Sequence, residues 1–184
     1  MPTLEITVFF KNFIVLLSIF LISESRGKSM KEQVKYINEL IKKLELDHVS
    51  TKPCTNTQLD LLHSISNGRK LPGAYMEFMS IMGNGTDFMR GDSCFMDEIE
   101  DLKQGANELL EENESEQRLG EEDFVFWMSQ GCMFCFFKLV DDDNPAVYFY
   151  NEVGEDRFIK VANSLTEFLI HRYEMNEKLF KEKL

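Results

Sequence analysis

The sequence predicts an α+β fold in which helices come first, strands follow and one helix ends the domain. Apolar residues at helical spacing dominate the chain up to about residue 110, and aromatic-rich β-type runs fill the interval from about residue 124 to residue 161. Separate blocks of helices and strands are typical of α+β domains. We therefore expect a single domain with a mostly antiparallel sheet of about five to six strands, packed by N-terminal helices and a C-terminal helix.

The first half of the chain contains signals for four helical segments. Apolar residues at helical spacing predict a first helix over Lys31–Leu46. The segment Thr55–Gln58 resembles a capping box and predicts the start of a second helix. Pro72 suits the first turn of a third helix, which should end near the glycines that follow residue 82. Phe95–Leu110 is expected to form a short strand edge followed by a helix.

The second half changes to β-type runs separated by turn residues. Because these runs are almost continuously apolar, we expect strands that are covered on both faces. The expected strands are Phe124–Met128, Cys132–Val140, Ala146–Tyr150 and Arg157–Val161. Ser164–Glu167 has the pattern of a second capping box and predicts the start of the closing helix.

The first 29 residues are expected to lie outside the domain, which we place at residues 30–184. Their apolar block, Phe13–Ile22, is too short to span a bilayer, which needs about 20 residues. It also lacks the small-residue cleavage site of a secretory signal. The favoured interpretation is an upstream misreading of the gene with the true start at Met30. An uncleaved anchor or poor signal, or a real extra strand or helix, remain as alternatives.

Composition and charge narrow the classes of partner. The net charge is −12, from 32 acidic against 20 basic residues. This balance argues against unassisted binding to nucleic acid, which needs clustered basic residues, and against docking on anionic lipid. It fits a basic protein partner, although acidity also keeps an ordinary small protein soluble. Only four cysteines occur in 184 residues, so a reducing, cytoplasmic location is the simpler interpretation.

No pattern in the chain predicts catalysis, a metal or a cofactor. Phosphate-binding, nucleotide-binding, nucleophile-elbow and zinc-protease motifs are all missing from the sequence. Cys132 and Cys135 form a CxxC pair, but it stands alone within an apolar run, and we expect both to be packing residues. The acidic turn Asp141–Asn144 lacks the register of a calcium-binding loop. We therefore expect a protein that is not an enzyme.

Four short elements, in order along about 100 residues, resemble the SUKH superfamily, which includes the Smi–Knr cell-wall regulators and many bacterial immunity proteins. They are Leu71-Pro72 with Tyr75, Phe78 and Asn84-Gly85; Phe126 with Gln130-Gly131, Phe134 and Phe136; Asn144-Pro145 with Val147, Tyr148 and Tyr150; and Ser164-Leu165 with Phe168-Leu169. Two positions depart from the family pattern. Cys132 stands where some members carry an aromatic residue, and Leu165 stands where Phe is usual. We expect these motif residues to be structural, because Pro72 suits a helix start, Asn84-Gly85 supplies a turn with positive φ and the aromatic residues fill the core. The resemblance implies an α+β domain that binds other proteins.

The resemblance implies a cytoplasmic immunity protein that neutralises a basic toxin encoded nearby, with a nuclease as the favoured kind of toxin. The alternative is a regulatory scaffold or small-ligand-binding domain with no toxin partner. Because nucleases present basic surfaces to nucleic acid, an acidic inhibitor can compete for those surfaces. The acidic stretch from residue 111 to residue 123 is expected to be a solvated loop or a frayed helix end. Its acids are candidate partner-binding residues: Glu111, Glu112, Glu114, Glu116, Glu121, Glu122 and Asp123. A second candidate patch consists of Asp141, Asp142 and Asp143.

Overall fold

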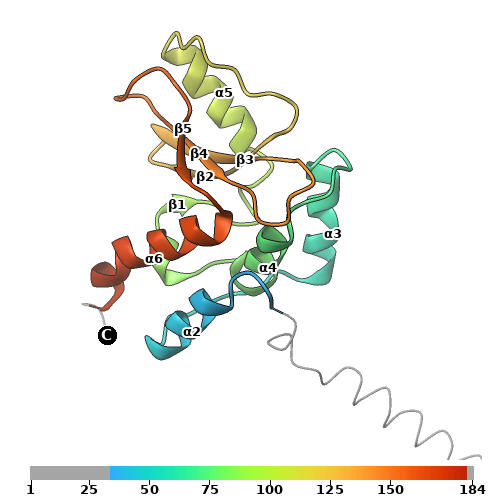
Figure 1. Ribbon diagram of the computed structural model, residues 1–184, viewed down its shortest axis with the longest axis vertical. Coiled ribbons are helices and arrows are strands. Elements are labelled where there is room, and N and C mark those ends of the chain that lie inside the picture. Colours follow the sequence, from blue (N-terminus) through green and yellow to red (C-terminus); the bar gives the residue numbers. More distant parts are fainter. Residues whose placement is uncertain (1–33, 182–184) are drawn as a thin grey trace, which may run out of the picture. The chain divides into compact units, whose positions relative to one another are not determined.

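The computed structural model describes residues 34–181, with side chains as far as Glu177, as an α+β unit (Figure 1). The expectations for residues 1–29 fall outside the described residues. The elements in chain order are α2 (Asn38–Leu46), α3 (Asn56–Ile65), α4 (Gly73–Met82), the 3-10 helix η2 (Asp87–Met89), β1 (Asp92–Ser93), α5 (Leu102–Glu112), β2 (Asp123–Ser129), β3 (Met133–Lys138), β4 (Val147–Asn151), β5 (Ile159–Ala162) and α6 (Leu165–Lys181).

The strands form one five-stranded sheet in the order β1-β2-β3-β4-β5, and each neighbouring pair is antiparallel. In the central pair, Phe124 lies opposite Phe137 and Trp127 lies opposite Cys135, with a register shift between Val125 and Trp127. The predicted α+β class and antiparallel sheet are therefore confirmed. All four β-type runs of the second half form strands.

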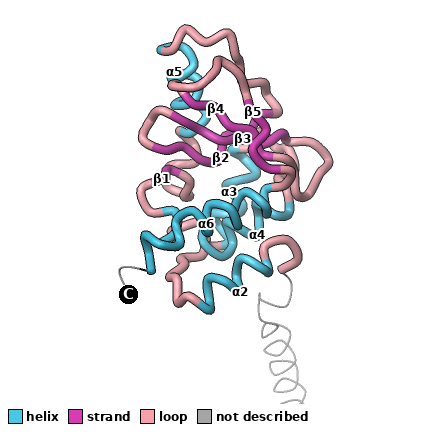
Figure 2. Tube along the Cα trace, turned by 60° about the vertical axis from the view of Figure 1, so that its left-hand side comes forward, coloured by secondary structure: helices cyan, strands magenta, loops and turns pink. Residues whose placement is uncertain are grey.

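Helices cover both faces of the sheet, with α5 on one side and α4 and α6 on the other (Figure 2). Tyr75 of α4 packs against Phe124 and Phe137, with ring centroids 5.4 Å from each. Phe168 of α6 meets the ring of Phe126 at 5.4 Å. As a result β2 and β3 are buried on both faces along most of their length, as their nearly continuous apolar sequences predict.

The residues that carried the family resemblance occupy structural positions. Pro72 is the N-cap of α4, and Tyr75 and Phe78 are fully buried on its inner face. The side chain of Asn84 is hydrogen-bonded to the carbonyl of Pro53 and to Gln58. The turn residues Gly85, Gln130 and Gly131 have positive φ, and the remaining motif side chains Leu71, Pro145, Val147 and Tyr148 are buried or half-buried.

The first described helix begins later than the sequence pattern predicts. Val34–Ile37 are not helical, and α2 starts at Asn38. The carboxylate of Glu77, on α4, accepts the backbone N–H groups of Lys35, Tyr36 and Ile37 at 2.8–3.1 Å. Because a distant carboxylate satisfies these donors, the segment needs no helical hydrogen bonds before residue 38.

Two further local expectations need correction. No strand forms at Phe95, because the chain turns there and the Met96 N–H donates to the Gly83 carbonyl at 2.8 Å; the edge strand is β1 instead. At the closing helix, Ser164 accepts the Glu167 N–H as expected, but the Glu167 carboxylate accepts the N–H of Asn163 rather than that of Ser164. The capping box at Thr55 and Gln58 is complete and confirms the prediction for α3.

The hydroxyl of Tyr75 allows a sharp test of the core. It is buried without a hydrogen-bond partner among the described residues, and burial raises the pKa of this phenol well above its usual value. Because an unpaired buried hydroxyl destabilises the folded state, Tyr75→Phe should leave the free energy of unfolding unchanged or raise it. Tyr75→Ala should lower it by about 3–5 kcal/mol. Urea unfolding of the three proteins measures this; a loss above about 1 kcal/mol in Tyr75→Phe would contradict the packing described.

Candidate functional site

The acidic stretch from Glu111 to Asp123 does not form one continuous surface. Ser115 is buried in its middle, and its hydroxyl and the Glu116 N–H both donate to the carboxylate of Asp156 in the β4–β5 turn. These bonds hold the chain at the end of the sheet that carries the β4–β5 turn. From there the chain runs to the opposite end, where β2 begins. The exposed acids are therefore divided into two groups at opposite ends of the strands.

The first group, which we call the α5-end patch, lies where α5 ends. Its members are exposed and comprise Glu111, Glu112, Glu114, Glu116 and Asp156. Hydrogen bonds from the Ser115 hydroxyl and the Glu116 N–H, with the nearby guanidinium of Arg118, hold the pKa of Asp156 below its usual value. An anchored carboxylate that is charged at neutral pH thus joins the four glutamates.

The second group, the strand-end patch, combines Glu121 and Glu122 with Asp141, Asp142 and Asp143. The two loops are joined directly, because the Leu139 N–H donates to the Glu122 carbonyl at 2.7 Å. The loop after β3 is also anchored to the helices: the Asp143 carbonyl accepts the Ala74 N–H, and the Asn144 side chain accepts the Thr166 N–H. This patch is therefore presented on a fixed loop.

Basic residues accompany the strand-end patch and neutralise part of it. Lys70 pairs with Asp143 at 2.9 Å, and Arg69 approaches Glu121 at 3.6 Å. The hydrogen bond from Lys70, and a second from the Tyr36 hydroxyl, lower the pKa of Asp143. Asp143 thus ties loops together, whereas Asp141 and Asp142 face solvent.

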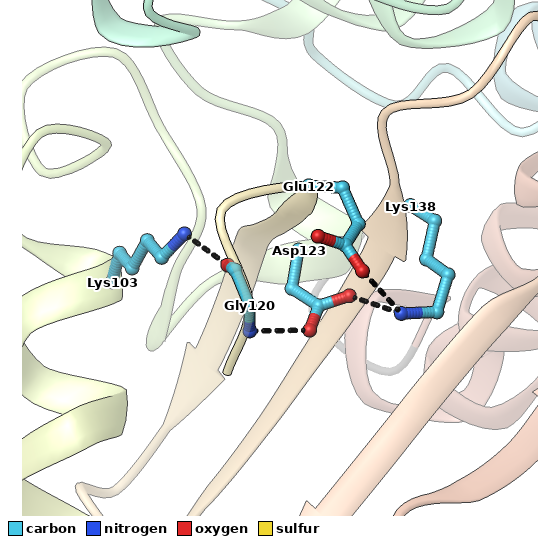
Figure 3. A network of polar contacts seen from close by, with 5 residues as sticks. All are labelled: Lys103, Gly120, Glu122, Asp123 and Lys138. Atoms are coloured by element: carbon cyan, nitrogen blue, oxygen red, sulfur yellow. Dashed lines mark hydrogen bonds and ion pairs between the residues drawn. The ribbon is translucent and has the colours of Figure 1, made fainter. Parts of the chain in front are cut away.

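Asp123 does not belong to the solvated surface on which the sequence placed it. It is 4% exposed, and Lys138 of the adjacent strand donates to its carboxylate at 2.7 Å (Figure 3). The Gly120 N–H donates to the same carboxylate at 2.8 Å, and Lys103 holds the Gly120 carbonyl at 2.7 Å. Hydrogen bonding to Asp123 raises the pKa of Lys138. Asp123 therefore fixes the start of β2 and is not available to a partner.

Glu122 shares this network but remains half-exposed. Its carboxylate lies 3.4 Å from the Lys138 ammonium, and the residue's own backbone N–H together with Lys138 lowers its pKa (Figure 3). The sequence could not separate Glu122 from Asp123, because both are acids in one acidic run. Their places relative to the sheet do so: Asp123 is the first residue of β2, which is buried along nearly its whole length, whereas Glu122 precedes the strand.

A groove between the sheet and α6 was not predicted from the sequence. It has a volume of about 990 Å³ and lies beside the β4–β5 side of the face that α4 and α6 cover. Trp127, Cys135 and Phe149 contribute from the sheet, and Phe168 and Met175 from α6. Helical periodicity predicts which residues of α6 point inward, but it does not show that this helix leaves part of the sheet uncovered.

The four cysteines are free thiols, and the CxxC pair does not form a site. Cys132 lies in the turn before β3, whereas Cys135 is buried within the strand. Within residues 34–181 no cluster of three or more metal-ligating side chains occurs. Burial raises the pKa of the Cys54 thiol, and raises those of Cys94 and Cys135 well above the usual range.

Thiol reactivity should follow this burial. The reacting species is the thiolate, so at about pH 8 Ellman's reagent should modify Cys132 rapidly and the other three thiols only as the protein unfolds. The release of thionitrobenzoate measures the two phases. Cys132→Ser should remove the fast phase and leave the slow one unchanged. A fast phase that persists in Cys132→Ser would show that a thiol described as buried is accessible.

The anchor at Asp156 should make stability sensitive to acid. A carboxyl whose folded pKa is depressed stabilises the fold above its ordinary value of 3.8, and this contribution is lost as pH falls through the folded pKa. Asp156→Asn should therefore be less stable than the parent at neutral pH, and the difference should shrink below about pH 4. Thermal melts across pH measure this. Glu155→Gln, an adjacent substitution outside this network, is the control; a constant difference for Asp156→Asn would contradict the assignment.

The sequence was compared with known protein families and with curated proteins. The SUKH family model described as SMI1-KNR4 cell-wall matches residues 66–169, more than half of the 184 residues. The match runs from the end of α3 into α6 and includes the whole sheet. No curated protein matches the chain. Among the described residues, none of the helices combines the length and apolar character needed to cross a membrane.

Proposed function

This chain belongs to the SUKH family, and we propose that it is a non-enzymatic immunity protein that binds and neutralises a cognate bacterial toxin. The partner is a basic toxin domain, most simply a nuclease, encoded beside this gene. Binding would take place in the bacterial cytoplasm. Occlusion of the toxin's active surface, without any covalent chemistry, is the proposed mechanism.

The observation that carries this proposal is the fixed presentation of acids at the two ends of the sheet. Asp156 anchors the α5-end patch, and bonds to Ala74 and Thr166 anchor the loop of the strand-end patch. Loops held in place by the fold lose little backbone freedom on binding, so less free energy opposes association. Acids arranged in this way are complementary to a surface that binds phosphates.

The acids of the described part divide into those engaged in holding the fold and those that face solvent. Asp123 and Asp143 are engaged in holding the strand ends and loops, so their charges stabilise the domain. By contrast Glu112, Glu116 and Asp141 are exposed and have no such structural role in the contacts described. Carboxylates of this second kind are free to act on a partner, through steering at long range and ion pairing at contact.

Charge-reversal variants test whether these patches in particular, rather than the protein's overall negative charge, speed association with the toxin domain. Glu112→Lys/Glu116→Lys in the α5-end patch and Glu121→Lys/Asp141→Lys in the strand-end patch should each slow association with the neighbour-encoded toxin domain. The effect should be large at about 20 mM salt and small at about 300 mM, because exposed charges are screened. Stopped-flow fluorescence measures the association rates, and inhibition of the toxin's activity measures the outcome.

Asp60→Lys/Glu100→Lys is the matched control for these double variants. It changes the net charge equally, but Asp60 lies on α3 and Glu100 precedes the opposite end of α5. The control should associate almost as fast as the parent. If association is slowed equally in all three variants, the patches have no specific role, and net charge alone accounts for the effect. A complete lack of binding by the parent protein would overturn the immunity function itself.

A further inference from the structure

The groove beside α6 has an apolar floor, most of it supplied by large side chains. Trp127, Met133 and Phe149 contribute from the sheet, and Phe168 and Met175 from α6. Val161, at the edge of the sheet, is 46% exposed, and Met175 is 59% exposed. Flexible methionines beside fixed aromatic rings are typical of surfaces that adapt to an inserted side chain. The volume of about 990 Å³ is large enough for several such side chains.

Two residues that line the groove carry buried N–H groups without an acceptor among the described residues. Trp127 is 2% exposed, and its indole N–H has no hydrogen-bond partner among the described residues. The guanidinium of Arg172 lies over the indole ring at 4.8 Å and pairs with Asp92, yet its Nε is likewise buried without a partner. Both nitrogens are enclosed by protein atoms, so they add no polar contact for an occupant, and the groove offers mainly apolar surface.

The rim of the groove is acidic. Glu39 of α2 and Glu167 and Glu174 of α6 line it, and Glu174 is the only one of these three with an ion pair among the described contacts, to Lys43 at 3.3 Å. The cation at the floor, Arg172, is already paired with Asp92. The groove therefore selects for positive charge beside an apolar insert.

The groove is also continuous with the strand-end patch. Thr166 lines the groove, and its N–H and hydroxyl both donate to the side chain of Asn144, in the loop that carries Asp141 and Asp142. A partner segment lying in the groove would thus meet acids at its edge and more acids just beyond it. The two features form one surface along the start of α6.

We infer that this groove is the docking site for a short segment of a protein partner, in which apolar side chains are flanked by Lys or Arg. The apolar side chains fill the floor, and the basic residues pair with the acidic rim. This inference rests on the proposed role as a protein-binding domain. It adds a contact that the acidic patches do not supply: apolar burial, which holds the partner after charge has steered it.

Trp127 is the single tryptophan of the chain, so the groove carries its own reporter. The probe is the synthetic peptide Lys-Leu-Phe-Lys-Leu-Leu-Lys-Lys, and the matched control is Glu-Leu-Phe-Glu-Leu-Leu-Glu-Glu. Both lack tryptophan. The basic peptide should change Trp127 fluorescence saturably and move the one indole N–H resonance in a two-dimensional nitrogen–proton spectrum. The acidic peptide should bind at least tenfold more weakly, about 1.4 kcal/mol.

Two double variants complete the experiment. Val161→Lys/Met175→Lys places charge in the groove and should weaken binding of the basic peptide at least tenfold. Val153→Lys/Leu61→Lys changes apolar residues that are 83% and 44% exposed outside the groove, and should bind as the parent does. Circular dichroism verifies that both fold. An unmoved indole resonance, equal binding of the two peptides, or unchanged affinity in the groove variant would overturn the inference. If the groove variant still binds the toxin domain as the parent does, the inference about the groove is overturned and the proposed function remains intact.

Discussion

Burial of the central strands on both faces is the constraint from which the rest of this structure follows. α4 and α6 cover one side of the β2–β3 pair and α5 covers the other, so this pair offers almost no solvent-facing side chains (Figure 2). Polar residues are therefore confined to the strand ends, the turns and the outer strands. The acidic patches at the strand ends and the groove beside β5 are among the surfaces that this arrangement leaves accessible. We propose that recognition takes place at these margins.

The same constraint decides which acids are structural. At the start of β2 the chain enters the strand pair that is covered on both faces, so an acid there must be paired, and Lys138 of the neighbouring strand supplies the charge for Asp123. One residue earlier the chain is still at the surface, and Glu122 keeps half of its exposure. In the loop after β3, Asp143 bonds to Tyr36 and Lys70 while Asp141 and Asp142 do not share these contacts. Charge alone does not distinguish these roles; position relative to the sheet does.

Much of the fold was predictable because its signals are local. The apolar runs of β2 and β3, the capping box at Thr55 and Gln58 and the proline before α4 each act within a few residues, and each predicts its element correctly. The failures arise where a distant group overrides the local pattern. Glu77 satisfies three backbone donors 40 to 42 residues earlier and delays α2, and the bond from Met96 to Gly83 turns the chain where a strand was expected. The groove has the same origin, since it depends on how α6 lies across the sheet. The apolar character of Trp127 and Phe149 predicts burial, but not a hollow between them.

Hydrogen exchange of this protein with and without the neighbour-encoded toxin domain tests the central claim most directly. If the partner binds at the margins of the covered sheet, amides in α5's last turn, residues 113–122, residues 139–146 and the first turns of α6 should exchange more slowly in the complex. The buried strands β2 and β3 should change little, because they are protected already. Protection confined to α2 and α3, with these margins unchanged, would contradict the account.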